Sequence, residues 1–120
     1  MAAKKLPGTG LHLRITLAPG VAFGPGKADL LAGIRDTGSI AAAGRAMRMS
    51  YKRAWQLVEE LNGSFREPLV EAAKGGAGGG GARLTPTGEA VLRHYRQLVD
   101  AATKGGAADL RAMRRLLPKE

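Results

Sequence analysis

An alternation of apolar and polar positions near the start of the chain predicts a β-strand. Apolar residues occupy every second position from Leu11 to Leu17, with polar or basic residues between them, which is the period of a half-buried strand. Pro19 and Gly20 should end this strand. Residues 1–10 are small, basic and rich in turn formers, so we expect them to be a flexible arm.

Apolar residues that recur with helical spacing then predict three short helices. The first covers residues 27–37 and ends before Gly38, a residue type that suits the position just past a helix. The second begins after Ser39 and the third after Ser50, because a serine hydroxyl can cap a first turn. The second helix is rich in alanine and glycine, so another helix can approach it closely. Two helices joined by so short a turn must cross steeply, which is the helix-turn-helix arrangement.

A glycine-rich hairpin and a long helix follow. Two runs, at residues 69–73 and 82–85, flank a stretch that is almost entirely glycine, which predicts a hairpin with a long tip. Thr85 is placed to cap the last helix and Pro86 to occupy its first position. This helix has the apolar spacing of one that packs on another helix, and the glycines at 105–106 should break or bend it. Its apolar residues are Val91, Leu92, Tyr95, Leu98, Val99 and Ala102.

This order of elements is the winged helix-turn-helix plan. The sequence therefore predicts a mainly α-helical fold with a small β-hairpin (α+β). We divide it into the arm at 1–10, the winged helix-turn-helix domain at 11–85 with its wing at about 69–85, and a helical segment at 86–120. A chain of 120 residues suits one such domain.

The charge of the chain favours a nucleic-acid partner. Its 19 Lys and Arg residues against 10 Asp and Glu give a net charge of +9, which attracts polyanions. An anionic membrane surface and simple solubility charge are the alternatives. The absence of cysteine excludes disulfides, thiolate metal sites and cysteine nucleophiles, and it favours a reducing cytoplasm. No signal-peptide core or apolar run long enough to span a bilayer is present, so no membrane partner is expected.

The phase of the third helix indicates which side chains can reach DNA. If its apolar stripe faces the core, Lys52 and Gln56 point directly away, at about 100° per residue, and Arg53 lies on one flank. Lys52 and Arg53 suit phosphate or guanine, and Gln56 suits adenine. The hydroxyls of Ser50 and Tyr51 can also donate hydrogen bonds. Glutamates later in the helix would be repelled by phosphate, so contact is expected in the first two turns.

Plainer interpretations compete with these. The third helix could be a solvated amphipathic helix of any small α-protein. We take Trp55 to be structural, because aromatic rings at the edge of an apolar stripe usually pack inward. Lys74 and Arg83 at the base of the wing could meet phosphates, or the glycine stretch could be only a linker. His12 and His94 have no adjacent carboxylate cluster or second ligand, so we expect no enzyme activity, cofactor or metal site.

Several strings of residues resemble one known family. They are Gly38-Ser39-Ile40, Met49-Ser50-Tyr51-Lys52-Arg53-Ala54-Trp55, Val58-Glu59-Glu60-Leu61-Asn62 and the glycine run ending in Ala82-Arg83-Leu84-Thr85. Over about residues 11–102 they resemble the N-terminal domain of ModE-type molybdate-responsive regulators. That domain is itself similar to the DNA-binding domain of LysR-type regulators.

The resemblance implies a homodimeric bacterial transcriptional regulator that binds double-stranded DNA in the cytoplasm, at the nucleoid. It implies that residues 86–120 form a helical dimerisation segment, with the six apolar residues named above as the interface. We expect DNA contacts from Ser39, Ser50, Tyr51, Lys52, Arg53, Gln56, Lys74, Arg83 and Thr85.

Full-length members of this family continue into two small β-barrel modules that bind molybdate or tungstate, whereas this sequence stops at Glu120. We therefore expect a stand-alone DNA-binding version or a fragment, with no small-molecule ligand of its own. A role in molybdenum-linked gene control is a hypothesis. The alternatives are an architectural protein that binds DNA without sequence choice and a DNA-binding subunit that relies on a separate sensor.

Overall fold

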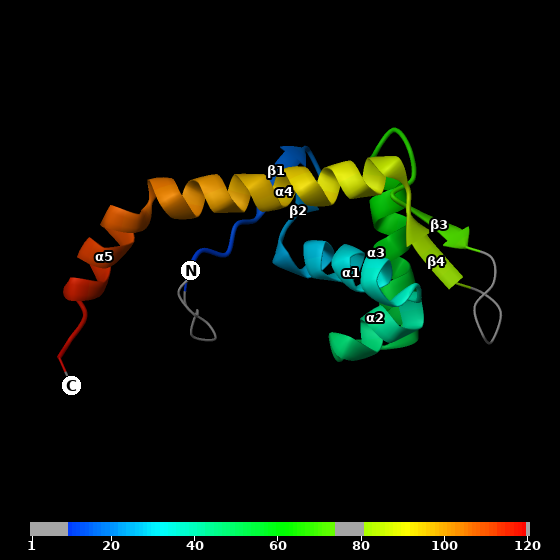
Figure 1. The fold of residues 1–120 in the computed structure, drawn as a ribbon, viewed down its shortest axis with the longest axis horizontal. Helices are drawn as coiled ribbons and strands as arrows, with labels where there is room; N and C mark the ends of the chain where they lie inside the picture. The colour runs from blue at the N-terminus through cyan, green and yellow to red at the C-terminus, as the bar shows by residue number, and fades with distance from the viewer. Residues whose placement is uncertain (1–9, 74–80, 120) are drawn as a thin grey trace.

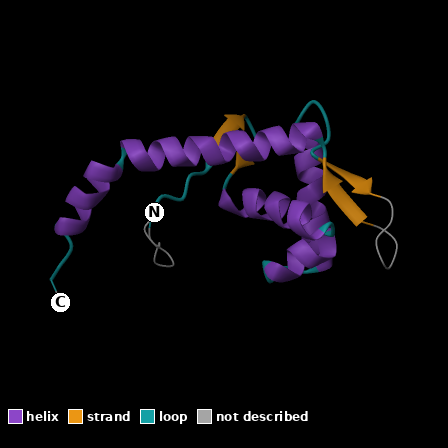
Figure 2. Ribbon diagram, viewed as in Figure 1, coloured by secondary structure: helices purple, strands orange, loops and turns teal. Residues whose placement is uncertain are grey.

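The structure, a computed structural model, describes residues 10–73 and 81–119. Within them, five helices and two two-stranded antiparallel sheets form an α+β fold (Figures 1 and 2), as predicted. In chain order the elements are β1 (Ile15–Ala18), β2 (Val21–Phe23), α1 (Pro25–Thr37), α2 (Ile40–Ala46), α3 (Tyr51–Ser64), β3 (Val70–Ala73), β4 (Gly81–Leu84), α4 (Pro86–Gly105) and α5 (Ala107–Arg115).

The first strand differs from the prediction and has a partner that was not predicted. The predicted strand covered residues 11–17, whereas β1 begins at Ile15 and pairs with β2, Ile15 lying opposite Phe23. The carbonyl of Leu13 instead accepts a 2.7 Å hydrogen bond from the hydroxyl of Tyr95 on α4. Phe23 is buried and meets the ring of Tyr95 edge-on at 5.0 Å. The hairpin therefore attaches the start of the domain to α4.

Side-chain caps start three of the helices where the sequence predicts them. Ser39, Ser50 and Thr85 each accept a 3.0 Å hydrogen bond from the main-chain N–H three residues later. Such a cap is worth about 0.5–2 kcal/mol relative to alanine. At the other end of α1, Gly38 adopts a left-handed conformation with φ 71°, which glycine tolerates without strain. These residues fix the end of α1 and the starts of α2, α3 and α4.

Small residues bring α2 close to both of its neighbours. A Cβ on Gly44 would lie 2.9 Å from the Cβ of Ala54 on α3, and a Cβ on Gly33 of α1 would lie equally close to Ala43. The short turn from α2 to α3 passes through Arg48, whose φ of 58° is left-handed. The helices can therefore pack and cross as tightly as the helix-turn-helix plan requires.

The core lies between the helix-turn-helix, the wing and α4. On α3, Ala54, Val58 and Leu61 are at most 2% exposed, so the predicted phase of this helix is confirmed. Figure 1 shows α4 crossing one side of the molecule, with α2 on the side away from it and the wing strands β3 and β4 at one end.

The two glycines at 105–106 end the long helix. α4 stops at Gly105, and α5 begins at Ala107, turned away from the α4 axis in Figure 1. None of the helices in the described part of the chain is both long and apolar enough to cross a bilayer.

Candidate nucleic-acid interface

The first two turns of α3 present a basic and polar face to solvent. Lys52, Arg53 and Gln56 are all exposed, while the opposite side of the same turns is anchored by the fully buried Ala54. The glutamates of α3 come only later in the helix. The exposed face therefore combines positive charge with an amide that can pair with a base edge.

Trp55 does not pack into the core, which corrects the sequence-based interpretation of it as structural. It is 40% exposed, and Tyr51, one turn earlier, is 59% exposed. The two rings form an edge-to-face pair with centroids 6.1 Å apart. The two rings lie on the flank of α3 that faces the wing. The buried stripe of α3 therefore includes Ala54 and leaves out its neighbour Trp55.

A hollow of about 460 Å³ lies between α3, the start of α2 and the wing. Tyr51 and Trp55 line it from α3, Ile40 lines it from α2, and parts of β3 and β4 close the far side. Ser39 is also at this hollow, half-buried. The aromatic pair thus borders an open space next to the basic face.

Both serines of the predicted interface cap a helix. Ser39 and Ser50 each use their side-chain oxygen to accept a capping bond, and a capping hydroxyl retains a proton that it can donate. Ser50 is exposed beside the basic face, whereas Ser39 is half-buried at the hollow. The geometry favours Ser50 over Ser39 as a donor to DNA.

The wing carries one exposed basic residue in the described part. Arg83 on β4 lies opposite Glu71 on β3, and its Nε is 2.9 Å from the glutamate oxygen. Both side chains are well exposed, and such a pair is worth at most about 1 kcal/mol. A phosphate could therefore compete for Arg83. Lys74, the other predicted wing contact, and the glycine tip lie outside the described residues.

Thr85 is a structural residue, which corrects its assignment as a DNA contact. It is 7% exposed, and its hydroxyl donates to the carbonyl of Pro68 at 2.7 Å while accepting the N–H of Gly88. Its main-chain N–H also bonds to the carbonyl of Leu69. Because it is buried and already bonded on both sides, this hydroxyl has no access to a phosphate.

The side-chain amide of Asn62 joins α3 to the wing through three hydrogen bonds to Leu69 and Val70. Sequence reasoning missed this role. An amide that directly follows the last buried residue of a helix could have been predicted to bond to the main chain of the next segment. The wing is thereby held in a fixed position relative to the exposed face of α3.

Sequence reasoning also missed basic residues around the turn and the N-terminal hairpin. Arg45 and Arg48 are exposed near the start of α3, and Figure 1 shows α2 alongside that end. Arg14 and Lys27 border a second hollow of about 320 Å³ on the Arg53 flank of α3. Arg48 lies within the short turn between α2 and α3, so the sequence alone could have identified it as a candidate phosphate contact.

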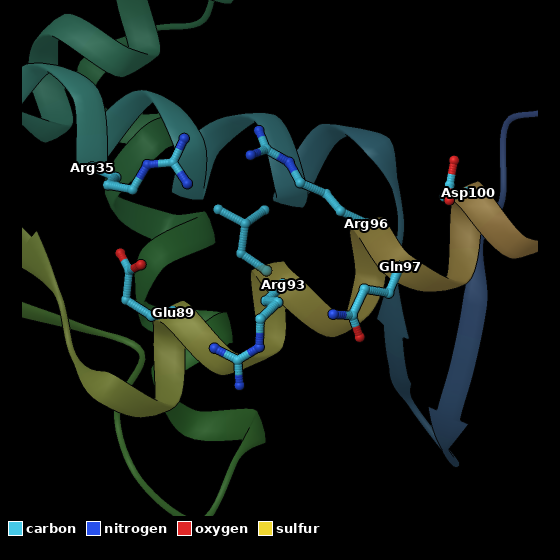
Figure 3. Close-up of a pocket in the computed structure, with 7 residues that line it drawn as sticks. Arg35, Glu89, Arg93, Arg96, Gln97 and Asp100 are labelled. Atoms are coloured by element: carbon cyan, nitrogen blue, oxygen red, sulfur yellow. The ribbon is translucent and has the colours of Figure 1, made fainter.

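A second group of arginines lies elsewhere, in a groove of about 380 Å³ between α1 and α4. In Figure 3, Arg35 and Arg96 point toward one another across it, while Arg93 points away from α1. Glu89 and Asp100 share the groove, so its charge is mixed. Among the described residues, no group of three or more His, Asp or Glu side chains is placed to hold a metal ion.

The predicted dimer residues divide into two sets. Leu92 and Tyr95 belong to the core of the protomer, at 1% and 8% exposed, so we correct their assignment to a dimer interface. Burial, and secondarily Asp29, raises the pKa of Tyr95. Leu98 is 48% exposed, while Val91, Val99 and Ala102 are half-buried.

Leu98 and Val91 line an apolar groove of about 300 Å³ between α4 and the N-terminal hairpin. The exposed Leu17 of β1 contributes to the same groove. This groove is the part of α4 best suited to meet another apolar surface.

Known proteins with similar sequences support a regulatory role. The model of the family described as bacterial regulatory helix-turn-helix protein, lysR family, matches residues 28–89. The molybdenum-pterin-binding protein MopB of Rhodobacter capsulatus is 44% identical over 91 residues, which is 76% of this chain and 32% of that protein. The transcriptional regulator ModE of Yersinia pestis is 41% identical over 80 residues, 67% of this chain and 30% of that protein.

The fold has a counterpart among solved structures. The crystal structure of the CbnR_DBD–DNA complex matches with a TM-score of 0.57 and 21% sequence identity, covering 72% of this chain and 94% of that chain. This likeness concerns the fold alone. The chain spans about a third of the length of the curated relatives it matches.

Proposed function

This chain belongs to the lysR family of bacterial regulatory helix-turn-helix proteins, and on that premise we propose that it regulates transcription as a homodimer bound to a specific DNA sequence. The observation that carries the proposal is the exposed face of Lys52, Arg53 and Gln56 on the first two turns of α3, set against a fully buried stripe. The family is one of regulators, and we propose no enzymatic activity.

In this proposal the N-terminal half of α3 enters the major groove. Gln56 pairs with adenine, while Lys52 and Arg53 contact guanine or phosphate. Arg48 and Arg83 bind backbone phosphates on either side and so fix the position of α3 on the duplex. Each of these side chains is exposed, so binding needs only rotamer changes.

We further propose that a second copy of the chain covers the groove beside Leu98. The groove is apolar, and α4 is 20 residues long, or about 30 Å, which is enough to pack along a partner helix. In a two-fold dimer the two α3 helices would meet half-sites about 34–36 Å apart on one face of the duplex. The target would then be an inverted repeat.

The names of the relatives motivate a narrower proposal. Two proteins that share more than 40% identity with this chain are named for molybdenum–pterin binding or as ModE. We propose that this chain acts on molybdenum-linked genes in the bacterial cytoplasm, at the nucleoid. No molybdate site is proposed within the described residues.

Selection of bound duplexes from a random library, followed by sequencing, tests the function. An enriched inverted repeat is expected, and its affinity should fall by about 10³ to 10⁵ between 50 and 200 mM salt if six to ten phosphates are contacted. Tight binding with no enriched sequence would contradict the proposal and favour an architectural role or dependence on a separate sensor.

A further inference from the structure

We propose that the Tyr51–Trp55 aromatic pair recognises the 5-methyl group of a thymine, which makes Trp55 a specificity-determining residue. This inference rests on the proposed function and names part of the sequence that the protein reads. It begins from an observation that the basic face does not explain, namely two exposed aromatic rings beside it.

The exposure of these rings indicates a binding surface. Trp55 is 40% exposed and Tyr51 59% exposed, in a chain with one tryptophan and two tyrosines. The other tyrosine, Tyr95, is buried against Phe23. Large apolar groups gathered on a surface commonly mark a contact with another molecule.

Their position beside the proposed base contacts indicates that the other molecule is DNA. Tyr51 and Trp55 are one turn apart, and Trp55 directly precedes Gln56 and lies one turn after Lys52. Residues three or four apart on a helix are surface neighbours. A base pair contacted by Lys52 or Gln56 would therefore lie within reach of Trp55, on the side of α3 that faces the wing.

The chemistry of the pair selects the group that it contacts. The two rings meet edge-to-face, with 78° between their planes, and the hollow behind them is lined partly by Ile40 and Val58. An uncharged, largely apolar surface has little attraction for phosphate. The apolar group that B-DNA presents in the major groove is the thymine methyl, which protein side chains read by apolar contact.

The experiment starts from the operator found by random-library selection. Each thymine is replaced by deoxyuridine, symmetrically in both half-sites, which removes one methyl and leaves the hydrogen-bonding edges intact. At one position, removal should weaken binding by the wild-type protein about fourfold per half-site, as expected for loss of one buried methyl group. Fluorescence anisotropy at constant salt measures the affinities.

Trp55→Ala tests whether the ring is responsible. This variant should bind the thymine operator more weakly, and its ratio of affinities for thymine and deoxyuridine should fall close to one. Tyr51→Phe keeps the ring and should keep the ratio of the wild type. Tyr51→Ala provides a second, independent loss of ring surface if Trp55→Ala fails to fold, which thermal unfolding would detect.

The outcomes separate the two proposals. A ratio unchanged in Trp55→Ala or Tyr51→Ala would assign the methyl contact to another residue and overturn the inference. An operator in which no thymine methyl matters would also overturn it, leaving the regulator function standing. Failure to enrich any sequence would overturn the proposed function and this inference with it.

Discussion

Asn62 at the end of α3 and Val70 at the start of β3 exchange hydrogen bonds in both directions. The amide nitrogen of Asn62 donates to the Val70 carbonyl at 3.0 Å, and its oxygen accepts the Val70 N–H at 3.0 Å. The same oxygen accepts the N–H of Leu69 at 2.8 Å. One side chain therefore replaces the main-chain partners that the first residues of the wing would otherwise lack.

Removing this side chain should destabilise the domain. Asn62→Ala leaves part-buried donors at Leu69 and Val70 unsatisfied, so we expect a loss of about 1–3 kcal/mol in the free energy of unfolding. Urea denaturation followed by circular dichroism measures it. Ser64→Ala is the control, because its exposed hydroxyl bonds only to the carbonyl of Glu60, and its effect should stay within about 0.5 kcal/mol. Equal losses in both variants would contradict this role.

Two glycines should respond in opposite ways to alanine. A Cβ on Gly88 would overlap the carbonyl oxygen of Leu69, whereas a Cβ on Gly63 of α3 would meet nothing within 4 Å. Gly88→Ala should therefore separate α4 from the wing and destabilise the fold. Gly63→Ala should raise the free energy of unfolding by roughly 0.5–1 kcal/mol, because alanine is the better helix former. Thermal unfolding of both variants tests the contrast, and a stable Gly88→Ala protein would refute it.

Tyr95 should make the free energy of unfolding depend on pH in the alkaline range. Because its pKa is raised above the ordinary value of 10.0 in the folded state, the unfolded chain loses the proton first. Its contribution is therefore fully present below about pH 10 and declines as the pH rises through the folded pKa. Below that range, Tyr95→Phe should cost about 0.5–1.5 kcal/mol, the worth of its hydrogen bond to Leu13.

Urea denaturation of the wild type and Tyr95→Phe from pH 8 to pH 11 measures this effect. The difference between the two proteins removes the contribution of other groups that titrate there. It should shrink above pH 10, and a difference that is constant with pH would contradict the expectation.

Gln56 and Lys52 should differ in how they affect DNA binding. Gln56→Ala should cost about 1–3 kcal/mol on the selected operator and much less on random DNA, since it removes a base contact. Lys52→Ala should weaken both if its contact is to phosphate, and it should lower the salt slope by about one. Lys104→Ala is the control, because that residue pairs with Asp100 on α4. If Gln56→Ala lost as much affinity for random DNA as for the operator, Gln56 would be a backbone contact and would not read a base.

A charge at Leu98 should break the proposed dimer. Leu98→Glu places a carboxylate at a residue that is 48% exposed in the protomer, so the single chain should fold normally while its dimer dissociates. Sedimentation equilibrium measures the association. Gln97→Glu adds the same charge to the adjacent groove shared with Arg35 and Arg96 and should leave the dimer intact. A dimer that survives Leu98→Glu would place the interface elsewhere.

The sequence predicts most of the helices because capping residues and apolar periodicity are local features that tertiary contacts do not override here. The caps at Ser39, Ser50 and Thr85 lie where the hydroxyl residues precede apolar stripes, and the phase of α3 follows from its buried residues. Local patterns could not predict β2, because a three-residue strand that directly follows a Pro–Gly turn has too few positions to show a period.

The errors at the candidate site have a common physical cause. Periodicity shows that one face of a helix is apolar and leaves open what covers that face. The stripe of α4 contains Leu92 and Tyr95, which its own protomer buries, and also Leu98, which it leaves exposed. In the same way, Trp55 lies beside the α3 stripe, and only the placement of the wing decides whether its ring is covered.

Thr85 couples the wing mechanically to α4. Through its hydroxyl and main-chain N–H, this one residue joins the loop before the wing to the first turn of α4. In the proposed homodimer, a rotation of α4 would therefore move the wing with it. The distance between the two wings along a duplex would then depend on the angle at which the two α4 helices cross.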